Sequence, residues 1–297
     1  MFKIEVKWWK NQCNDMSGQF LQVFPSMEKY VMRSIDFRMW ILHRYMIPNG
    51  FGGVACTCSD HPDTDDFGIH VTSGCNKGGG RTRIHDALNH ELHSMCNYAE
   101  LWSVLEATNQ FDDTKKRPDI VIRNPEALGY YTPGPHSVQV TELILDTTVR
   151  SPIDGAAKAK LVHPKTLEEA LKVGVAAERG YKEKMDKYSK LIYPEKKQNR
   201  NLHEPVRWIV PFVIQSTGHL HEKSMEFLER LAEAAETIKR IPKVNLLTYF
   251  KRRIALCLAK NMAATMYQRG HSLASHTGGY KDRSFDTRHI MELAPDN

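Results

Sequence analysis

The chain has 297 residues, of which 41% are hydrophobic and 26% are charged. This composition is typical of a globular protein, excludes a disordered or fibrous chain, and allows one large domain or two small ones. The formal net charge of +6 suits a polyanionic partner such as a nucleic acid, although many proteins share it. The N-terminus lacks the apolar core of a signal peptide, and no segment approaches the roughly 18 apolar residues of a membrane span. We therefore expect an intracellular protein, nuclear or cytoplasmic, with no membrane partner.

The first part of the chain is predicted to hold an N-terminal helical segment over residues 1–55. Within it, Ser26 is placed to cap a helix that extends to about residue 46. Residues 56–80 are rich in Gly, Cys, His and Asp. They predict a loop that is held by something other than an apolar core.

The middle of the chain, residues 81–218, alternates between helical and strand-like patterns. Its expected elements are helices 82–98 and 166–192 and strands 101–108, 119–122, 137–149 and 206–214. That order predicts an α/β core with a mixed central sheet flanked by helices. The last segment, residues 219–297, is expected to hold two amphipathic helices, 219–240 and 244–268, and a tail.

Two aspartates accompany the strand-like apolar runs: Asp119 opens DIVI, and Asp146 lies in ELILDTTV. A carboxylate beside a buried strand needs a partner charge, and one divalent cation can serve two such groups. Mg²⁺ (or Mn²⁺) takes one or two carboxylates, keeps several waters and binds phosphate oxygens. Glu142 lies on the same strand face but roughly 13 Å from Asp146 at strand rise, so it is a poor co-ligand. By spacing alone, both aspartates could equally end strands or cap turns.

A second group of candidate ligands comprises Cys56, Cys58, His70 and Cys75. The His-x4-Cys half has zinc-knuckle spacing, whereas the Cys-x-Cys half is tighter than the usual gap of two residues. Four soft or borderline ligands in a loop with few apolar residues favour a structural, tetrahedral Zn²⁺. His61 competes with His70 for the fourth place, and the alternative is a set of incidental thiols and surface histidines.

Basic residues follow this loop in the stretch KGGGRTR, residues 77–83. A glycine run before a helix N-terminus is suited to phosphate, so Lys77, Arg81 and Arg83 are expected to contact a nucleic-acid backbone. Arg117, which ends the run KKR, and the run KRR at 251–253 are further candidates. Such runs are also common on simply solvated faces.

Taken in order, several short motifs resemble the endonuclease-like C-terminal region of non-LTR retrotransposon (reverse transcriptase) polyproteins. They extend from Cys56 to about Gly270, some 215 residues, and are CTC, GIH-x4-C, KGGGRTRIHDAL, RPDIVI, LILDTTV-x-SP, KxxKY and FVIQSTG. The resemblance implies a restriction-endonuclease-like PD-(D/E)xK core with Asp119 and Asp146 as the metal-binding acids on adjacent strands. It also matches His85 to a histidine of that family, with a structural role.

The chain departs from the general PD-(D/E)xK pattern because Thr148 stands where a lysine usually follows the second acid. The resembled retroelement group also lacks that lysine and uses one from the following helix. On a helical wheel Lys184 falls about 60° from the centre of the apolar stripe, Lys182 about 100° and Lys187 about 120°. Lys184 is therefore the predicted catalytic lysine, and Glu178 is a weaker candidate for a metal contact.

Two functions follow as hypotheses. The first is a Mg²⁺-dependent endodeoxyribonuclease that hydrolyses DNA phosphodiester bonds, derived from a retroelement. The second is a catalytically inactive, zinc-stabilised module that binds DNA or RNA, as would result if Thr148 reflects loss of the lysine without replacement.

Overall fold

The computed structural model describes residues 8–23, 27–58, 63–75, 77, 79–107, 117–131, 137–153, 172–192 and 205–276. Its centre is a mixed sheet of four strands: β1 (Ser103–Leu105), β2 (Ile120–Ile122), β3 (Glu142–Arg150) and β4 (Arg207–Gln215). The strands lie side by side in the order β1-β2-β3-β4. The pairs β1–β2 and β2–β3 are antiparallel, and β3–β4 is parallel. This arrangement confirms the predicted α/β class and the mixed, helix-flanked sheet.

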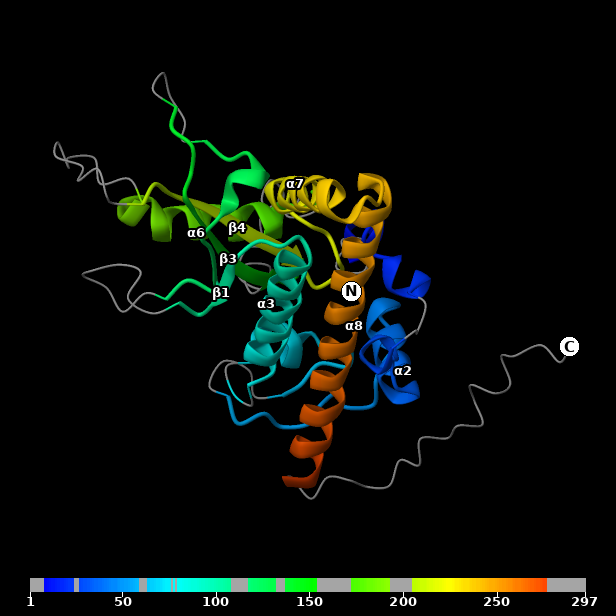
Figure 1. Cartoon of the computed structure of the whole chain (residues 1–297). Helices are drawn as coiled ribbons and strands as arrows, with labels where there is room; N and C mark the ends of the chain where they lie inside the picture. The colour runs from blue at the N-terminus through cyan, green and yellow to red at the C-terminus, as the bar shows by residue number, and fades with distance from the viewer. Residues whose placement is uncertain are drawn as a thin grey trace, which may run out of the picture.

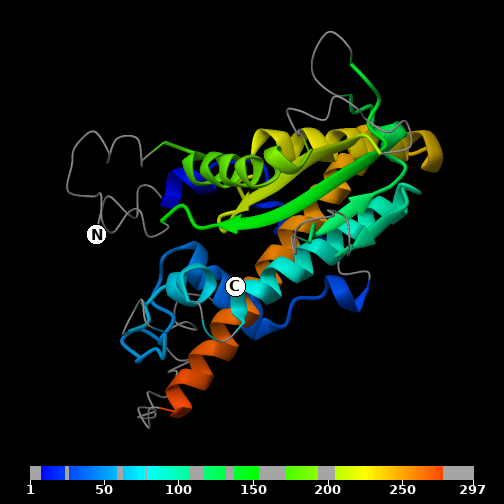
Figure 2. The same ribbon diagram turned by 90° about the vertical axis from the view of Figure 1, so that its left-hand side faces the viewer.

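Helices cover both faces of the sheet. On one face lies α6 (Val175–Ile192), whose Tyr188 is fully buried in a small cluster with Val121, Ile144 and Ile209. On the other face lie α3 (Gly80–Tyr98), α7 (Glu222–Lys239) and α8 (Lys243–His276), which share the main core with the opposite sides of the same strands. In Figure 1, α6 lies to the left of the sheet and α8 to its right. Figure 2 views the molecule from the α6 side, with α8 passing behind the strands.

The long helix α8 joins distant parts of the chain. It packs against α3 on one side and α2 (Ser34–Arg44) on the other, as Figure 1 shows. A single core cluster therefore includes Phe20 near the N-terminus and Met266 near the end of α8. Close to that end, a Cβ on Gly270 would come within 2.4 Å of the Phe51 ring, so the helix lies directly against the cysteine-containing loop.

Strand β4 is at the edge of the sheet among the described residues, and its backbone has a regular alternation. Val213 donates its N–H to Ser224 Oγ (2.8 Å) and accepts from the His221 N–H (3.0 Å), so both of its backbone groups point away from β3. Alternation places the backbone of Pro211 on the same outer edge. A proline is tolerated there because no ladder bond to β3 requires its missing N–H.

Several predicted boundaries were wrong by more than a turn. The helix predicted over 26–46 begins only at Ser34, where Asp36 lies in the first turn and pairs with Arg33 (2.7 Å), a favourable position for an acid at a helix N-terminus. Residues 28–30 form a 3₁₀ turn instead. The strand predicted at 101–108 is shorter at both ends, the strand predicted at 137–149 begins only at Glu142, and α8 continues past residue 268. The first part of the helix predicted at 166–192 lies outside the described residues.

Candidate functional site

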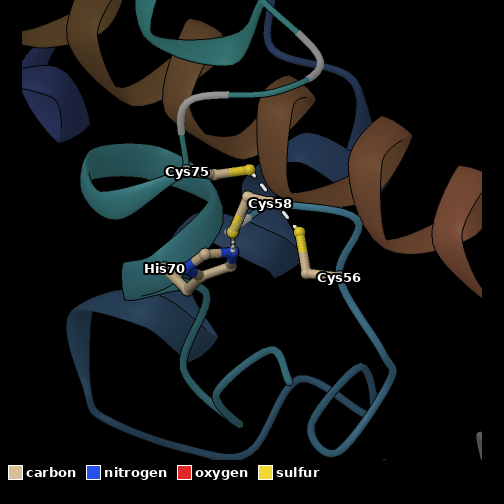
Figure 3. Close-up of side chains that lie close together, drawn as sticks. All are labelled: Cys56, Cys58, His70 and Cys75. Atoms are coloured by element: carbon tan, nitrogen blue, oxygen red, sulfur yellow. Dashed lines mark hydrogen bonds between the residues drawn. The ribbon is translucent and has the colours of Figure 1, made fainter. Parts of the chain in front are cut away.

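Cys56, Cys58, His70 and Cys75, together the Cys₃His cluster, point toward one another (Figure 3). Their ligand atoms all lie within 4.8 Å of one another, and all but Cys56 are buried. The Sγ atoms of Cys56 and Cys75 are 3.6 Å apart, and Cys58 Sγ is 3.5 Å from His70 Nε2. A tetrahedral zinc with bonds of about 2.3 Å separates its ligand atoms by about 3.8 Å, so this set could hold a metal ion such as zinc.

The loop that carries the Cys₃His cluster is held by its own polar contacts. Asp65 accepts hydrogen bonds from the backbone amides of Phe67 and Ile69 (both 2.9 Å) and of His70. His70 opens a short π-helical turn, η3 (His70–Gly74), so the carboxylate caps the segment that presents the histidine. His43 of α2 donates from Nδ1 to the Phe67 carbonyl (2.7 Å), which ties this loop to the helical layer.

A cation from α8 adjoins the Cys₃His cluster. Arg269 Nη2 lies 3.7 Å from Cys56 Sγ and 3.4 Å from Thr57 Oγ1. Burial opposes the Cys56 thiolate, but hydrogen bonds from Cys58, Cys75 and Arg269 outweigh it and lower the pKa of Cys56. The thiolate is the form that binds a metal. His61, the alternative fourth ligand in the sequence, lies outside the described residues.

The two predicted aspartates come together on neighbouring strands. Ile120 of β2 pairs with Leu145 of β3, so the antiparallel register brings Asp119, just before β2, beside Asp146 in the middle of β3. Asp119 Oδ2 accepts a hydrogen bond from the Thr147 amide (2.6 Å), which fixes the first carboxylate against the second strand.

Two lysines of α6 reach Asp146. Lys184 pairs with Oδ1, and Lys187 Nζ lies 2.9 Å from Oδ2. Asp119, Asp146, Lys184 and Lys187 are called the acid–lysine site below. The helical wheel singled out Lys184 and placed Lys187 too far round the helix. Lys187 nevertheless reaches Asp146 as well, because a four-carbon side chain can span the remaining angle.

Charge balance in the acid–lysine site keeps Asp146 ionised despite its burial. Burial acts to raise the pKa of Asp146, but the charge and hydrogen bond of Lys184, with Tyr188 and Lys187, lower it below its ordinary value. The same proximity, added to burial, raises the pKa of Tyr188. Tyr188 is thus both a core residue, as its position on the apolar stripe predicted, and a neighbour of the carboxylate.

His85 is a further member of this region. Its Nε2 lies 3.0 Å from Asp119 Oδ2, and its Nδ1 lies 3.2 Å from Asp86 Oδ1. Burial acts to lower the pKa of His85, but the hydrogen bond and charge of Asp119 raise it above its ordinary value. The sequence gives no local signal for the contact, because 34 residues separate His85 from Asp119.

An open cleft lies between the Cys₃His cluster and His85, the neighbour of Asp119. It has a volume of about 370 Å³ and is lined by the start of α3, including Gly80, Arg81 and His85, by Cys75 of the cluster, and by Thr148 of β3. Gly79 precedes α3 in the left-handed conformation (φ 67°), which a glycine adopts without strain. The free amides at the helix N-terminus therefore lie along the cleft, where they favour an anion.

The remaining predicted basic residues differ in whether their side chains contact other residues of the protein. Lys77 and Arg81 are exposed, whereas the exposed Arg83 contacts Gln268 and Arg117 pairs with Glu106 (3.0 Å). All three side chains of the run at 251–253 have partners within the protein: Lys251 pairs with Asp15, Arg252 with Gln22, and the buried Arg253 with Glu91. Lys115 and Lys116 lie outside the described residues.

The two glutamates considered as additional ligands lie in other contacts. Glu142 pairs with Arg207 (2.9 Å), in keeping with its prediction as a poor co-ligand. Glu178 pairs with His221 (2.8 Å) and Lys182 (3.2 Å), away from the aspartates.

Comparison with protein-family models gives no match for this chain. Comparison with curated proteins gives no significant match either. No helix among the described residues is both long and apolar enough to cross a membrane.

Proposed function

We propose that the chain is a metal-dependent endodeoxyribonuclease of the retroelement-associated PD-(D/E)xK type, with the acid–lysine site as its active site. The observation that carries this proposal is the meeting of Asp119 and Asp146 on adjacent strands, with Lys184 and Lys187 on the second acid. In the PD-(D/E)xK pattern a lysine usually stands at the position of Thr148. Here the cations beside Asp146 come instead from α6, which is distant in sequence.

The residues present fit a hard divalent cation. Mg²⁺ is held in proteins by one or two carboxylates together with waters, and Asp119 and Asp146 supply that set. A magnesium ion there would make a bound water more acidic and offset charge on a phosphate. Because both oxygens of Asp146 are paired in this structure, Lys184 or Lys187 has to withdraw from Asp146 when the cation binds.

A displaced lysine has a clear role beside the carboxylates. Its ammonium group can orient the attacking water by hydrogen bonding and stabilise the negative charge that develops on the phosphate. Lys184 has the more enclosed side chain, 18% exposed against 36% for Lys187, so we assign the catalytic role to Lys184. Lys187 is then a positioning residue that keeps Asp146 ionised.

The open cleft gives the DNA backbone a route to these groups. It leads from the N-terminus of α3, with the exposed Arg81, to His85 beside Asp119. A phosphate bound at the helix N-terminus would share the positive end of α3 with the guanidinium group. The Cys₃His cluster, at the other side of that N-terminus, would hold a structural zinc that fixes the wall of the cleft.

A second candidate function is a catalytically inactive module that binds DNA or RNA. The pairing of both Asp146 oxygens with lysines favours it, because a carboxylate that is already neutralised can be a purely structural group. The two candidates share the zinc-stabilised cleft and differ only in whether a divalent cation can compete with the lysines.

The deciding experiment is a supercoiled-plasmid nicking assay in Mg²⁺. Wild-type protein is expected to convert plasmid to the open circle, and Asp146→Asn to lose at least about 100-fold in rate, as expected when an electrostatic contributor to catalysis is removed. Glu142→Gln is the matched control because it changes a carboxylate on the same face of β3 that pairs with Arg207. Equal cutting by wild type and Asp146→Asn, or no cutting by either while DNA is still bound, would leave only the binding function.

A further inference from the structure

A second cavity lies at the outer edge of β4, between α6 and α7. Its volume is about 310 Å³, within the range of small-molecule pockets. Four aromatic side chains and two cationic ones dominate its lining. They are Tyr130, Tyr131, Tyr181, Trp208, Lys223 and Arg230. We call it the β4-edge pocket, and neither the Cys₃His cluster nor the acid–lysine site contributes a residue to it.

Residues 208 to 211 of β4 line one part of the pocket. Val213 and Gln215 direct their amides outward, to Ser224 and the His219 carbonyl. Strand alternation therefore places the amide and carbonyl of Ile209 on the same edge, facing the pocket. One donor and one acceptor thus lie side by side among aromatic rings.

The two cations are held in different ways. Arg230 lies 4.6 Å from the centre of the Tyr130 ring and donates to the carbonyls of Leu128 (2.9 Å) and Gly129 (2.8 Å), so it is a fixed part of the wall. Lys223 is half-exposed, and its Nζ lies 2.8 Å from Glu226, an acid that also lines the pocket and pairs with Arg230 (3.0 Å). Such an exposed pair is worth little, so Lys223 can exchange its partner for a phosphate.

We propose that the β4-edge pocket binds an unpaired base of a single-stranded nucleic acid. Aromatic faces stack on any base, the Ile209 donor and acceptor can meet the hydrogen-bonding edge of a base, and Lys223 can bind the adjoining phosphate. Tyr131, whose side chain is 55% exposed, offers the most accessible ring. The lining carries two cations, Lys223 and Arg230, against one acid, Glu226, so its charge still favours a polyanion.

An extended peptide that adds a strand to β4 is the competing occupant of this edge. Strand addition needs a regular series of outward backbone groups. Pro211 has no N–H to offer on that edge, and Ser224 and His221 occupy the groups of Val213. The available edge is therefore too short for a strand, whereas it is long enough for a planar base.

The pocket lies close to the acid–lysine site. Tyr181 precedes Lys184 by three residues on α6, a rise of roughly 5 Å, and Pro211 is the register partner of Asp146 across the β3–β4 pair. This inference rests on the proposed nucleic-acid function and deepens it: the bound strand would be unpaired beside the site of cleavage. A nuclease with such a pocket acts on melted or single-stranded DNA.

The test uses the full zinc-loaded chain in buffer without Mg²⁺, and a fluorescein-labelled 12-nucleotide DNA followed by anisotropy. A strand of the same length with abasic sites carries the same phosphates without bases. Wild-type protein is expected to bind the base-bearing strand more tightly than the abasic strand. Tyr131→Ala is expected to weaken only the base-bearing strand, by about 5-fold to 150-fold, the range for one lost stacking contact.

Matched variants separate stacking from charge. Tyr45→Ala removes another exposed tyrosine, 47% accessible and outside the pocket, and is expected to leave both affinities unchanged. Lys223→Ala is expected to weaken both strands equally, whereas Lys239→Ala, on the same helix but paired with Glu100, is not. Base-bearing DNA should also quench tryptophan fluorescence, and Trp208→Phe should remove that quenching while the strand still binds.

Three outcomes would overturn the proposal: equal affinity for the two strands, wild-type binding by Tyr131→Ala, or quenching of Trp208 by an extended Val-Thr repeat peptide and not by DNA. The last would assign the edge to a protein partner. Base binding is measured without Mg²⁺ and plasmid nicking with it, so the two readouts are independent. If the protein binds the base-bearing strand but does not nick plasmid, only the proposed nuclease activity is wrong. If it nicks plasmid but does not prefer the base-bearing strand, only the proposed base pocket is wrong.

Discussion

The ligands of the Cys₃His cluster come from 20 consecutive residues, whereas the acid–lysine site draws on the start of β2, the middle of β3 and the side of α6. In the cluster, three thiols and an imidazole face one another with Arg269 at the rim. In the acid–lysine site, each buried negative charge already has a positive or hydrogen-bonding partner from the protein.

This difference predicts different roles for the two metal ions proposed above. Thiolates packed within a few ångströms repel one another, so the cluster needs a cation to be stable. The acid–lysine site is neutralised without metal, so a divalent cation there has to compete with ammonium groups. A metal ion in the Cys₃His cluster would therefore support the fold, whereas the proposed Mg²⁺ at the acid–lysine site would exchange with the lysines.

Loss of zinc is expected to have the largest effect. Structural zinc in finger peptides contributes about 10–16 kcal/mol of apparent binding free energy near neutral pH, so the cysteine loop cannot keep its shape without it. Cys58→Ala should reduce the zinc content from about one ion per chain to none, measured by mass spectrometry of the purified protein. Hydrogen exchange should then increase over residues 63–75 while β3 and β4 remain protected.

Cys13→Ala is the control for this variant because Cys13 is an exposed free thiol far from the cluster in sequence. It should retain full zinc content. If Cys58→Ala still carries one zinc ion per chain, the Cys₃His cluster is not the site of the tightly held metal, and its proposed structural role is wrong.

Removal of both lysines is expected to have the next largest effect. Lys184→Met with Lys187→Met leaves the Asp146 carboxylate, whose side chain is 2% exposed, without a cation. Breaking a buried pair costs about 3–5 kcal/mol, and the lower end applies here because Lys187 is screened by solvent. Urea unfolding should report that loss. Millimolar Mg²⁺ should recover more stability in the double variant than it adds to wild type.

Lys182→Met is the matched control, because it removes an exposed lysine of the same helix that pairs only with Glu178. Its effect should stay below about 1 kcal/mol with or without Mg²⁺. If Mg²⁺ stabilises wild type and double variant equally, the cation does not compete with the lysines, and the proposed exchange at Asp146 is wrong.

The sequence predicted the parts of these sites that depend on local pattern. Apolar runs beside Asp119 and Asp146 predicted their strands, and ligand spacing predicted the Cys₃His cluster. Apart from Lys184, which the helical wheel placed nearest the sheet, contacts that depend on how helices lie against the sheet could not be predicted. Examples are Lys187 beside Asp146, His85 beside Asp119, and Arg253 buried against Glu91. Long side chains make their contacts through tertiary placement, which periodicity along one helix does not encode.

The smallest expected effect concerns the support of the cysteine loop by α2. Burial lowers the pKa of His43, against the opposing effect of its hydrogen bond to the Phe67 carbonyl. A base whose pKa is lower when folded stabilises the fold above its unfolded pKa, near 6.5, and loses that contribution as the pH falls toward the folded value. The free energy of unfolding of wild type should therefore decrease below about pH 6.5, by at most about 1.4 kcal/mol per pH unit from this group.

His43→Gln removes that titration while keeping a side-chain N–H for the Phe67 carbonyl, so its unfolding free energy should fall less steeply between pH 7 and pH 5. Protonation of the zinc ligands acts on both proteins alike, and the difference in slope from urea titrations isolates His43. If the unfolding free energies of wild type and His43→Gln fall equally with pH, His43 does not make the contact between α2 and the loop depend on pH. The acid sensitivity of the cysteine loop would then come from the metal ligands alone. The loop would depend on its metal ion for charge balance, whereas the acid–lysine site is neutralised by its own lysines.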